Sequence, residues 1–186
     1  MYRKINIQSS YTKNNLGKNI YDAVIRLKPE KVIEFGSLNG YSAAAIAMGL
    51  RDNGLGHLYA NDLWENYPFQ SSTSKNCLDN IKKMNLEEYV TIGSLDFWEW
   101  LKNPTDFDLL HIDISNTGKV IEAAYDALQG YLDSGSVIIF EGGSEERDKV
   151  EWMIKYNKSP INPLKKKIGY KIINPNHPSI SIIERV

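Results

Sequence analysis

Residues 31–48 constrain the fold more than any other part of the chain. They read as a buried strand (31–35), a loop bracketed by Gly36 and Gly40, and a helix that begins at Tyr41. A strand, a glycine loop and a helix N-terminus in that order form a pocket for a nucleotide-like ligand. The spacing is E-x-G-x-x-x-G, whereas nicotinamide-dependent enzymes carry G-x-G-x-x-G. The segment therefore predicts an α/β fold and favours a different cofactor.

Strands and helices are expected to alternate along most of the chain. Such alternation is typical of a parallel sheet with helices on both faces. The last two strands have too short a link to run parallel, so one of them must be antiparallel. We therefore predict a Rossmann-like, seven-stranded, mostly parallel sheet that ends in an antiparallel C-terminal hairpin. The expected strands are 31–35, 57–61, 89–93, 107–112, 136–140, 169–173 and 179–184, and the expected helices are 14–28, 41–52, 73–84, 96–101, 117–132 and 145–156.

The length and charge of the chain limit its domain organisation and its binding partners. With 186 residues the chain fits one domain. Residues 31–141 are expected to form the cofactor-binding core, preceded by a helix and lid segment (1–30) and followed by a helix and hairpin (142–186). The 22 basic and 23 acidic residues nearly cancel, and the one basic run, 165–167, fits a solvated turn. We expect no nucleic-acid partner, and no apolar run approaches the ~20 residues of a membrane span.

Cysteine usage indicates a reducing compartment. Cys77 is the only cysteine, so a disulfide framework and a thiolate metal cluster are both excluded. Its helical surroundings favour a buried apolar role over a nucleophilic one. The N-terminus has no apolar core of signal-peptide length. Together these features predict a cytoplasmic protein.

Each expected parallel strand ends at a polar or glycine residue. In open α/β sheets, ligands bind outside the carboxyl ends of the strands. Gly36 and Gly40 permit close approach of the backbone to a ligand, and Ser42 adds a hydroxyl donor in the first turn of the helix. The alternative is a plain strand-to-helix turn. The strand ends carry Glu34 to Gly36, Asn61 and Asp62, Gly93 and Ser94, Asp113, and Glu141 with Gly142.

The second and third strands add candidate residues for a nucleoside. Asp62 lies 28 residues after Glu34, where a carboxylate can accept hydrogen bonds from ribose hydroxyls, although Asp is also common in turns. Trp64 could lie against an adenine face or serve in the core or a lid. Residues 94–96 would lie at the adenine edge, unless Asp96 caps the short helix that begins there.

These motifs resemble those of a known family. Residues 34–42 look like motif I of the class I S-adenosylmethionine-dependent methyltransferases, and Gly40-Tyr41-Ser42 is similar to the catechol O-methyltransferase-like branch. Residues 61–65 and 107–113 resemble the small bacterial methyltransferases of the same group. The likeness spans about residues 31–141. It implies S-adenosylmethionine as cofactor and a small-molecule acceptor, with a hydroxyl favoured.

The resemblance also implies roles for individual residues. The backbone of residues 36–40 and the Ser42 hydroxyl would hold the methionine part of the cofactor. Glu34 would steady the loop or approach the methionine amine. Asp62 would bind the ribose. The implied cofactor-binding residues are Glu34, Gly36, Ser37, Leu38, Gly40, Ser42, Asp62, Leu63, Trp64, Ser94, Leu95, Asp96 and Asp113.

The catechol-type enzymes also bind a divalent cation near the acceptor, and here this sequence departs from their pattern. Asp113 matches their first metal ligand, and Glu141 stands where the second is expected. Gly142 replaces an Asn ligand, and Asn116 stands where a Lys is expected. Two carboxylates can still hold Mg²⁺ or Ca²⁺ with water completing the shell. Asp113 and Glu141 are therefore candidate metal ligands and candidate catalytic residues.

Asp113 has three interpretations: a metal ligand, a general base, or a residue that shapes the pocket floor. His111 shares its face of the strand and is expected to be a buried, satisfied histidine. His177, in the terminal hairpin loop, is expected to face solvent. Residues 1–15 and 62–74 could form a lid over a small acceptor. A second subunit could complete the pocket instead, which would make the protein a homodimer.

Two other functions stay open at this stage. A degenerate module would keep the fold, and with it the cofactor, but would lack chemistry, as the departures at Asn116 and Gly142 suggest. A nicotinamide oxidoreductase would also use an acid after the second strand, although the glycine spacing argues against it.

Overall fold

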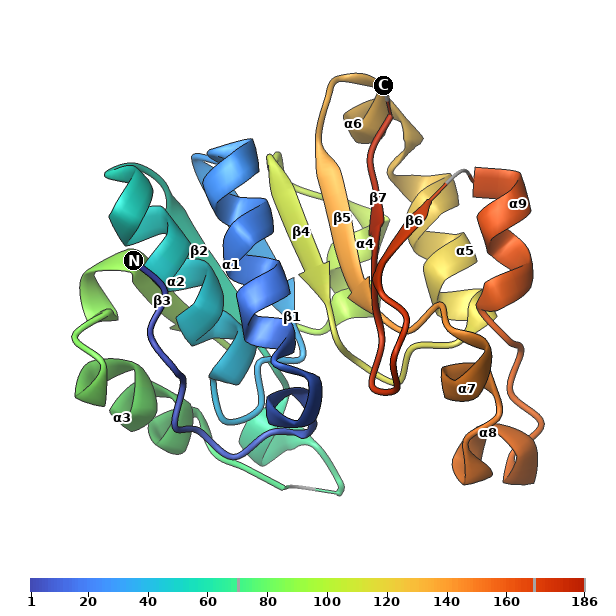
Figure 1. Cartoon of the computed structure of the whole chain (residues 1–186), viewed down its shortest axis with the longest axis horizontal. Helices are drawn as coiled ribbons and strands as arrows, with labels where there is room; N and C mark the ends of the chain where they lie inside the picture. The colour runs from blue at the N-terminus through green and yellow to red at the C-terminus, as the bar shows by residue number, and fades with distance from the viewer. Residues whose placement is uncertain (70, 169, 186) are drawn as a thin grey trace.

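One sheet of seven strands organises the computed structural model, which describes residues 1–69, 71–168 and 170–185. The strand order is β3-β2-β1-β4-β5-β7-β6 (Figure 1). Strands β1 to β5 pair in parallel, and β7 runs antiparallel to both β5 and β6. The predicted seven-stranded, mostly parallel sheet with an antiparallel hairpin is confirmed. The strands are β1 (Lys31–Phe35), β2 (His57–Asn61), β3 (Val90–Gly93), β4 (Leu109–Ile112), β5 (Val137–Glu141), β6 (Lys171–Asn174) and β7 (Ile180–Ile183).

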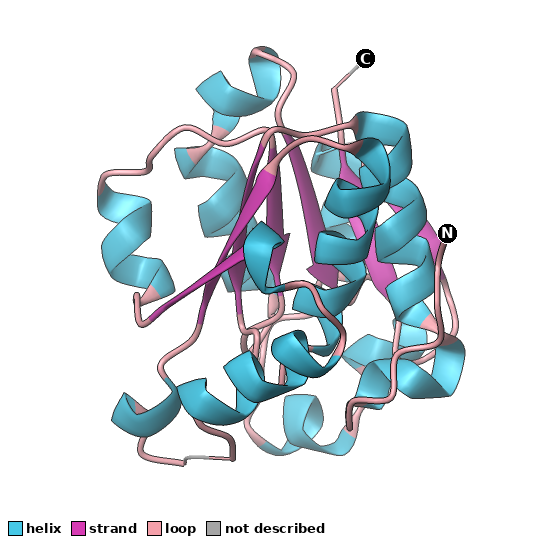
Figure 2. Cartoon of the chain, turned by 90° about the vertical axis from the view of Figure 1, so that its left-hand side faces the viewer, coloured by secondary structure: helices cyan, strands magenta, loops and turns pink. Residues whose placement is uncertain are grey.

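Alternation along the strands builds a separate hydrophobic core on each face of the sheet. In β1, Val32 packs into a core with α1 and α2, whereas Ile33 packs into a second core with α4, α5 and α6. Seen along the sheet, helices flank it on both sides (Figure 2). The α-helices are α1 (Leu16–Leu27), α2 (Tyr41–Asn53), α3 (Ser74–Lys83), α4 (Phe97–Lys102), α5 (Gly118–Ala127), α6 (Gln129–Asp133), α7 (Glu145–Asp148), α8 (Glu151–Lys155) and α9 (Lys165–Ile168).

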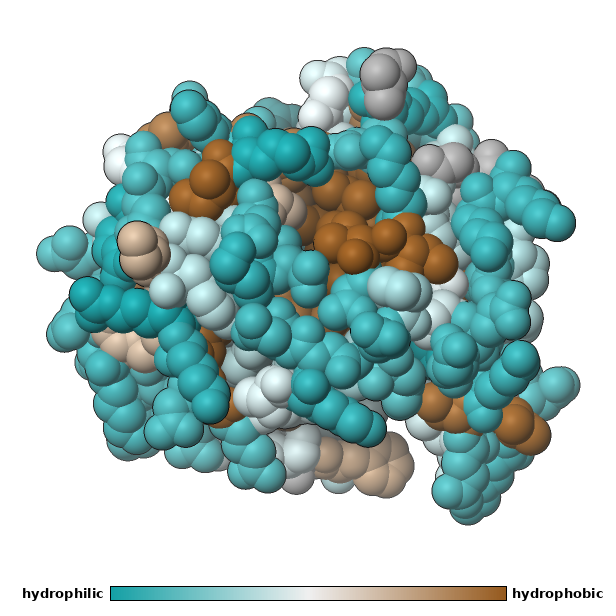
Figure 3. Space-filling model, in the orientation of Figure 1, coloured by the Kyte–Doolittle hydropathy of each residue, from teal (hydrophilic) through white to brown (hydrophobic). Residues whose placement is uncertain are grey.

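The surface is mostly hydrophilic in the view of Figure 3, with an apolar patch near its centre. In the same view of Figure 1, strands β5, β6 and β7 have no helix in front of them among the described residues. No helix in the part of the chain that the structure describes is long and apolar enough to cross a membrane.

Two predicted helices are each divided in two. The expected helix 117–132 breaks at Leu128, where φ is −110° and ψ is 12°. The expected helix 145–156 breaks before Val150, whose backbone is extended. Here the Asp148 carboxylate accepts hydrogen bonds from the amides of Ile161 and Asn162 at 2.8 and 2.7 Å. This tertiary contact anchors the end of α7 to a distant loop, so apolar periodicity could not reveal it.

Other differences concern short segments. The lysine run 165–167, expected in a solvated turn, belongs to α9. The expected strand 169–173 starts at Gly169, which lies outside the described residues, and β6 begins at Lys171. Within the described ranges, four 3₁₀ helices were not predicted: η1 (Ser10–Asn14), η2 (Trp64–Asn66), η3 (Glu87–Tyr89) and η4 (Asn162–Leu164).

Candidate active site

The glycine loop between β1 and α2 packs directly against the end of β4. Gly36 and Gly40 have φ angles of +94° and +88°, which glycine adopts without strain. A Cβ atom on Gly36 would lie 1.9 Å from the carbonyl oxygen of Asp113. The Gly36 amide donates a hydrogen bond to the Asn61 carbonyl at 2.9 Å. The loop therefore depends on glycine at position 36 and is fixed to both neighbouring strands.

Glu34 supports this loop from inside the protein. Its fully buried carboxylate accepts hydrogen bonds from the Ser37 hydroxyl at 2.6 Å and from Nδ1 of His111 at 2.9 Å. Burial raises the pKa of Glu34, but hydrogen bonds from His111, Ser37 and Ser42 outweigh it, and the net pKa is lowered. Of the two roles that the resemblance implied, this arrangement favours steadying the loop. His111 is buried as expected, but its Nε2 has no hydrogen-bond partner among the described residues.

Replacing Glu34 with glutamine is expected to lower the free energy of unfolding by about 2 kcal/mol at pH 7, because a buried charged hydrogen-bond network is broken. The pKa of Glu34 is lowered in the folded protein, so its contribution is present above the ordinary pKa of 4.5 and is lost as the pH falls through the folded value. Urea unfolding at pH 7 and pH 4 measures the difference, which should shrink at pH 4. The exposed Glu87→Gln serves as control; equal losses in both variants would contradict the prediction.

The Asp62 side chain, at the end of β2, is held by the loop opposite it. Its Oδ2 accepts a hydrogen bond from the Leu38 amide at 2.8 Å, and its Oδ1 accepts one from the Leu63 amide at 2.7 Å. The Trp64 indole donates to the Leu38 carbonyl at 2.9 Å and is only 2% exposed. Of the two interpretations of Trp64, the structure favours the core role.

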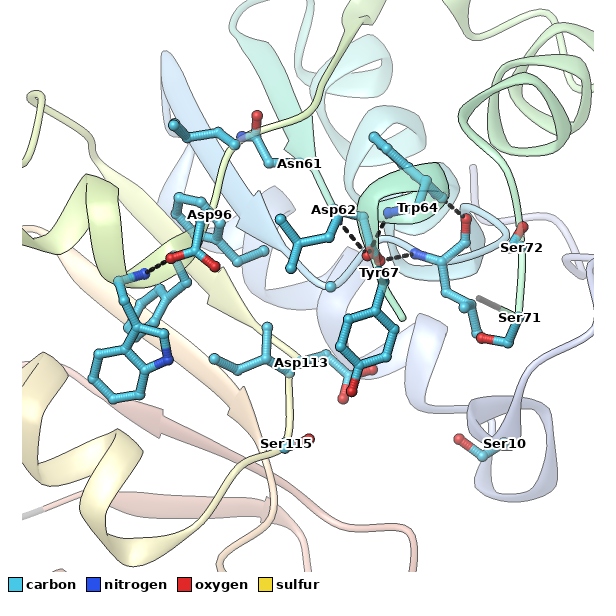
Figure 4. Close-up of a pocket in the computed structure, with 18 residues that line it drawn as sticks. Ser10, Asn61, Asp62, Trp64, Tyr67, Ser71, Ser72, Asp96, Asp113 and Ser115 are labelled. Atoms are coloured by element: carbon cyan, nitrogen blue, oxygen red, sulfur yellow. Dashed lines mark hydrogen bonds between the residues drawn. The ribbon is translucent and has the colours of Figure 1, made fainter. Parts of the chain in front are cut away.

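A cavity of about 600 Å³ lies beside these residues, within the size range of small-molecule sites. Asp62 and Asp113 both line it, from the ends of different strands (Figure 4). Asp96 lines it too and also caps α4, since its Oδ1 accepts from the Trp98 amide at 2.8 Å. The lining residues are Ser10, Phe35, Gly36, Leu38, Asn61, Asp62, Leu63, Trp64, Tyr67, Ser71, Ser72, Leu95, Asp96, Phe97, Trp98, Asp113, Ile114 and Ser115.

The cavity brings together most, but not all, of the predicted cofactor-binding residues. Both expected lid segments contribute, through Ser10 and Tyr67. Asn61 was noted at a strand end but not assigned to the cofactor, and sequence reasoning missed Trp98 and Ser115, each two residues from a predicted position. The predicted residues outside the lining are Glu34, Ser37, Gly40, Ser42 and Ser94.

A second cavity, of about 610 Å³, adjoins the first. Both are lined by Ser10 and by Asp113, Ile114 and Ser115, so Asp113 stands where the two meet. His177 is exposed, as expected, and also lines this second cavity. The remaining lining residues are Ser9, Thr12, Lys13, Glu141, Arg147, Trp152 and Pro178.

Asp113 has the electrostatic properties of a group that exchanges protons near neutral pH. Burial and the charge of Glu141 raise its pKa to about 7, against the opposing influence of His111 and Tyr11. Perturbed carboxylates in clefts are candidates for functional groups. This property favours the general-base interpretation among the three that the sequence left open.

Tyr11 is a neighbour of Asp113 that no sequence motif indicated. It lies in η1, is 1% exposed, and packs edge-on against His111 with ring centroids 6.3 Å apart. Burial and the charges of Asp113 and Glu141 raise its pKa well above the usual value. Its hydroxyl has no hydrogen-bond partner in the described parts of the chain. Tyr11 is therefore a buried, neutral neighbour of Asp113, contributed by the N-terminal segment.

The residues at the predicted metal position do not fit a divalent cation. Glu141 is already paired, because Nε of Arg147 lies 2.7 and 2.8 Å from its two carboxylate oxygens. Asn116 donates its side-chain amide to the carbonyls of Ile112 and Glu141 and provides no free Lys-like base. Within the described residues, no group of three or more His, Cys, Asp or Glu side chains could hold a metal ion.

Known proteins match this fold and the predicted family. A family of methyltransferase domains matches residues 33–141, more than half of the chain. Among the solved structures it resembles are TomG from Streptomyces achromogenes, an O-methyltransferase of tomaymycin synthesis solved with S-adenosylmethionine (SAM), an O-methyltransferase from Bacillus cereus solved with S-adenosylhomocysteine (SAH), and the SAH-bound methyltransferase PaMTH1 from Podospora anserina.

The likeness to these structures is one of fold. Identities are 11%, 18% and 15%, and TM-scores are 0.62, 0.60 and 0.64, in the same order. The matches cover 92%, 92% and 96% of this chain and 80%, 81% and 80% of the others. No curated protein matches the sequence significantly. The fold is that of the class I methyltransferases, as predicted. By its match over residues 33–141, the chain belongs to the methyltransferase domain family.

Proposed function

We propose that this chain transfers a methyl group from S-adenosylmethionine to a hydroxyl of a small molecule. The observation that carries the proposal is the meeting of two cavities at Asp113. One cavity adjoins the glycine loop and Asp62, and the other adjoins Glu141 and His177. The two solved O-methyltransferases of this fold, bound to SAM or SAH, support the choice of cofactor and of an oxygen acceptor.

The first cavity is the proposed cofactor site. Gly36 lines this cavity and packs so closely on the Asp113 backbone that no side chain fits there, and Asp62 offers a carboxylate to ribose hydroxyls. Leu63 and residues 95–98 would flank the adenine. When bound, the cofactor supplies an electrophilic methyl group on its sulfonium. The protein needs chiefly to align an acceptor with that group.

The second cavity is the proposed acceptor site, and its volume suits a small molecule. Asp113 stands at its boundary with the cofactor site, where the acceptor oxygen would approach. With a pKa of about 7, a substantial fraction of Asp113 is ionised at neutral pH and can accept the proton that a hydroxyl loses. Asp113 is therefore the proposed general base.

Calorimetric titration with SAM and with SAH tests the cofactor assignment. We expect stoichiometric binding of both, and no stabilisation by NAD or NADP in thermal shift. Stabilisation by a nicotinamide cofactor alone would instead favour an oxidoreductase. A screen of hydroxylated acceptors with radiolabelled SAM then separates an enzyme from a degenerate binding module, because turnover of any acceptor excludes the module.

Replacing Asp62 with alanine is expected to weaken SAH binding by about 30-fold, which corresponds to about 2 kcal/mol for hydrogen bonds to a charged group. The measurement is calorimetric titration of the variant. Asp79→Ala, on the exposed face of α3, is the control and should keep wild-type affinity. Unchanged SAH binding by a folded Asp62→Ala protein would remove Asp62 from the site.

A further inference from the structure

A buried arginine lies in the wall of the proposed acceptor cavity. Arg147 is 4% exposed, and its α7 helix is capped by the Ser144 hydroxyl, which accepts a hydrogen bond from the Arg147 amide at 3.1 Å. Isolated arginines are rarely buried to this degree, because a charge loses its hydration there. The contacts of this guanidinium therefore indicate what it does.

Most of the guanidinium is engaged by groups at the carboxyl ends of β4 and β5. Nε is within 2.8 Å of both Glu141 oxygens, and Nη2 donates to the Asn116 carbonyl at 3.0 Å. The Trp152 ring lies 4.9 Å from Cζ and covers one face. Arg147 is thus held rigidly beside Glu141, the residue that stands at the predicted second metal position.

The charges around Arg147 explain why a cation is needed there. Glu141 is 8% exposed, and it lines the same cavity as Asp113. Two carboxylates in one cavity repel each other unless one is protonated or a positive charge lies beside them, and a divalent cation or a guanidinium can supply that charge. The guanidinium is built into this chain, and it engages both oxygens through which Glu141 could bind a metal.

One nitrogen of the Arg147 guanidinium has no partner in the described part of the chain. Nη1 is buried and has no hydrogen-bond partner among the residues that the structure describes. An unpaired buried donor on a charged group is costly, and this one belongs to a side chain that lines the cavity beside Asp113. Nη1 carries two N–H groups, and neither has a partner within the described ranges, whereas Nε and Nη2 are both engaged.

We propose that Arg147 replaces the divalent cation at the acceptor site: its fixed positive charge occupies the carboxylate of Glu141, and the site does not bind metal. This inference rests on the proposed function, whose acceptor cavity it uses. It also widens the range of acceptors: a metal ion favours vicinal oxygens that chelate it, and a site without the metal does not require such a pair.

Titration with Mn²⁺, followed by electron paramagnetic resonance in the presence of SAH, tests the replacement without knowledge of the acceptor. The wild-type protein is expected to bind no stoichiometric Mn²⁺. Arg147→Met frees Glu141 and should bind Mn²⁺ at least about ten-fold more tightly than the wild type, because two unpaired carboxylates then require a cation. Arg147→Lys keeps a positive charge and, as the matched control, should bind no Mn²⁺.

Two outcomes would overturn the inference. One is stoichiometric Mn²⁺ binding by the wild type that Asp113→Asn removes; the other is a folded Arg147→Met protein that gains no Mn²⁺ binding, as a purely structural arginine would predict. If Arg147→Met does not fold, the Mn²⁺ titration of the wild-type protein remains the test: stoichiometric Mn²⁺ binding overturns the inference, and its absence supports it. Calorimetric titration of the same samples with SAH tests the proposed function separately, because it measures cofactor binding and not metal binding.

A chelator gives a further test once the screen has found an acceptor. EDTA should change the turnover rate less than two-fold, and abolition of turnover by EDTA would also overturn the inference.

Discussion

A Gly36→Val protein is expected to lose SAH binding and about 3 kcal/mol or more of its free energy of unfolding. The valine would adopt a strained positive φ angle, and its Cβ would meet the Asp113 carbonyl oxygen at 1.9 Å. That oxygen belongs to backbone at the end of β4, so the glycine loop would have to move away from the cofactor cavity. Urea unfolding and calorimetric titration with SAH measure the two effects.

Gly54→Val separates the clash from the backbone strain. Gly54 also has a positive φ, +71°, but a Cβ there would meet nothing within 4 Å. This control should therefore lose stability through strain alone and keep wild-type affinity for SAH. If Gly36→Val retained SAH binding, the glycine loop would not be the cofactor cradle.

Asp113→Asn is expected to lower the rate of methyl transfer by about 10²- to 10⁴-fold, the usual contribution of a general base. Asparagine keeps the shape of the side chain but cannot take a proton from the acceptor hydroxyl. The measurement is kcat/KM with an acceptor from the screen. Asp106→Asn, which changes an exposed residue before β4, is the matched control and should retain full activity.

The pH profile distinguishes a base from a residue that only shapes the pocket. Asp113 must be ionised to act, so wild-type kcat/KM should rise with pH and level off above the pKa of about 7. Because this pKa is raised in the folded state, ionisation of Asp113 destabilises the protein as the pH rises through that value. Asp113→Asn should therefore also be more stable than the wild type at pH 8. A variant that keeps the wild-type profile would contradict the assignment.

The order of the core elements followed from local sequence alone. Continuous apolar runs such as residues 137–140 predict strands buried on both faces. In β1, likewise, Val32 packs into one core and Ile33 into the other. The breaks at Leu128 and Val150 were missed, and the second of them lies beside a contact between segments distant in sequence. That contact joins Asp148 to the amides of Ile161 and Asn162.

The cofactor side of the site was more predictable than the acceptor side. Gly36, Asp62 and Asp113 lie at strand ends, and parallel strands bring their carboxyl ends to one edge of the sheet. Arg147 is different: among charged neighbours in residues 145–149 it reads as part of a solvated helix face. Only the fold shows that it pairs with Glu141. Tyr11 likewise reaches the site through packing of the N-terminal segment against His111.

The contact between Gly36 and the end of β4 has a thermodynamic consequence. The Asp113 amide donates to the Phe35 carbonyl at 2.8 Å, directly before the glycine loop. A cofactor that orders the glycine loop therefore also orders Asp113, which lines the acceptor cavity as well. Two ligands that stabilise the same local conformation bind cooperatively, and the coupling is reciprocal. Donor and acceptor should thus each raise the affinity for the other, even though they occupy separate cavities.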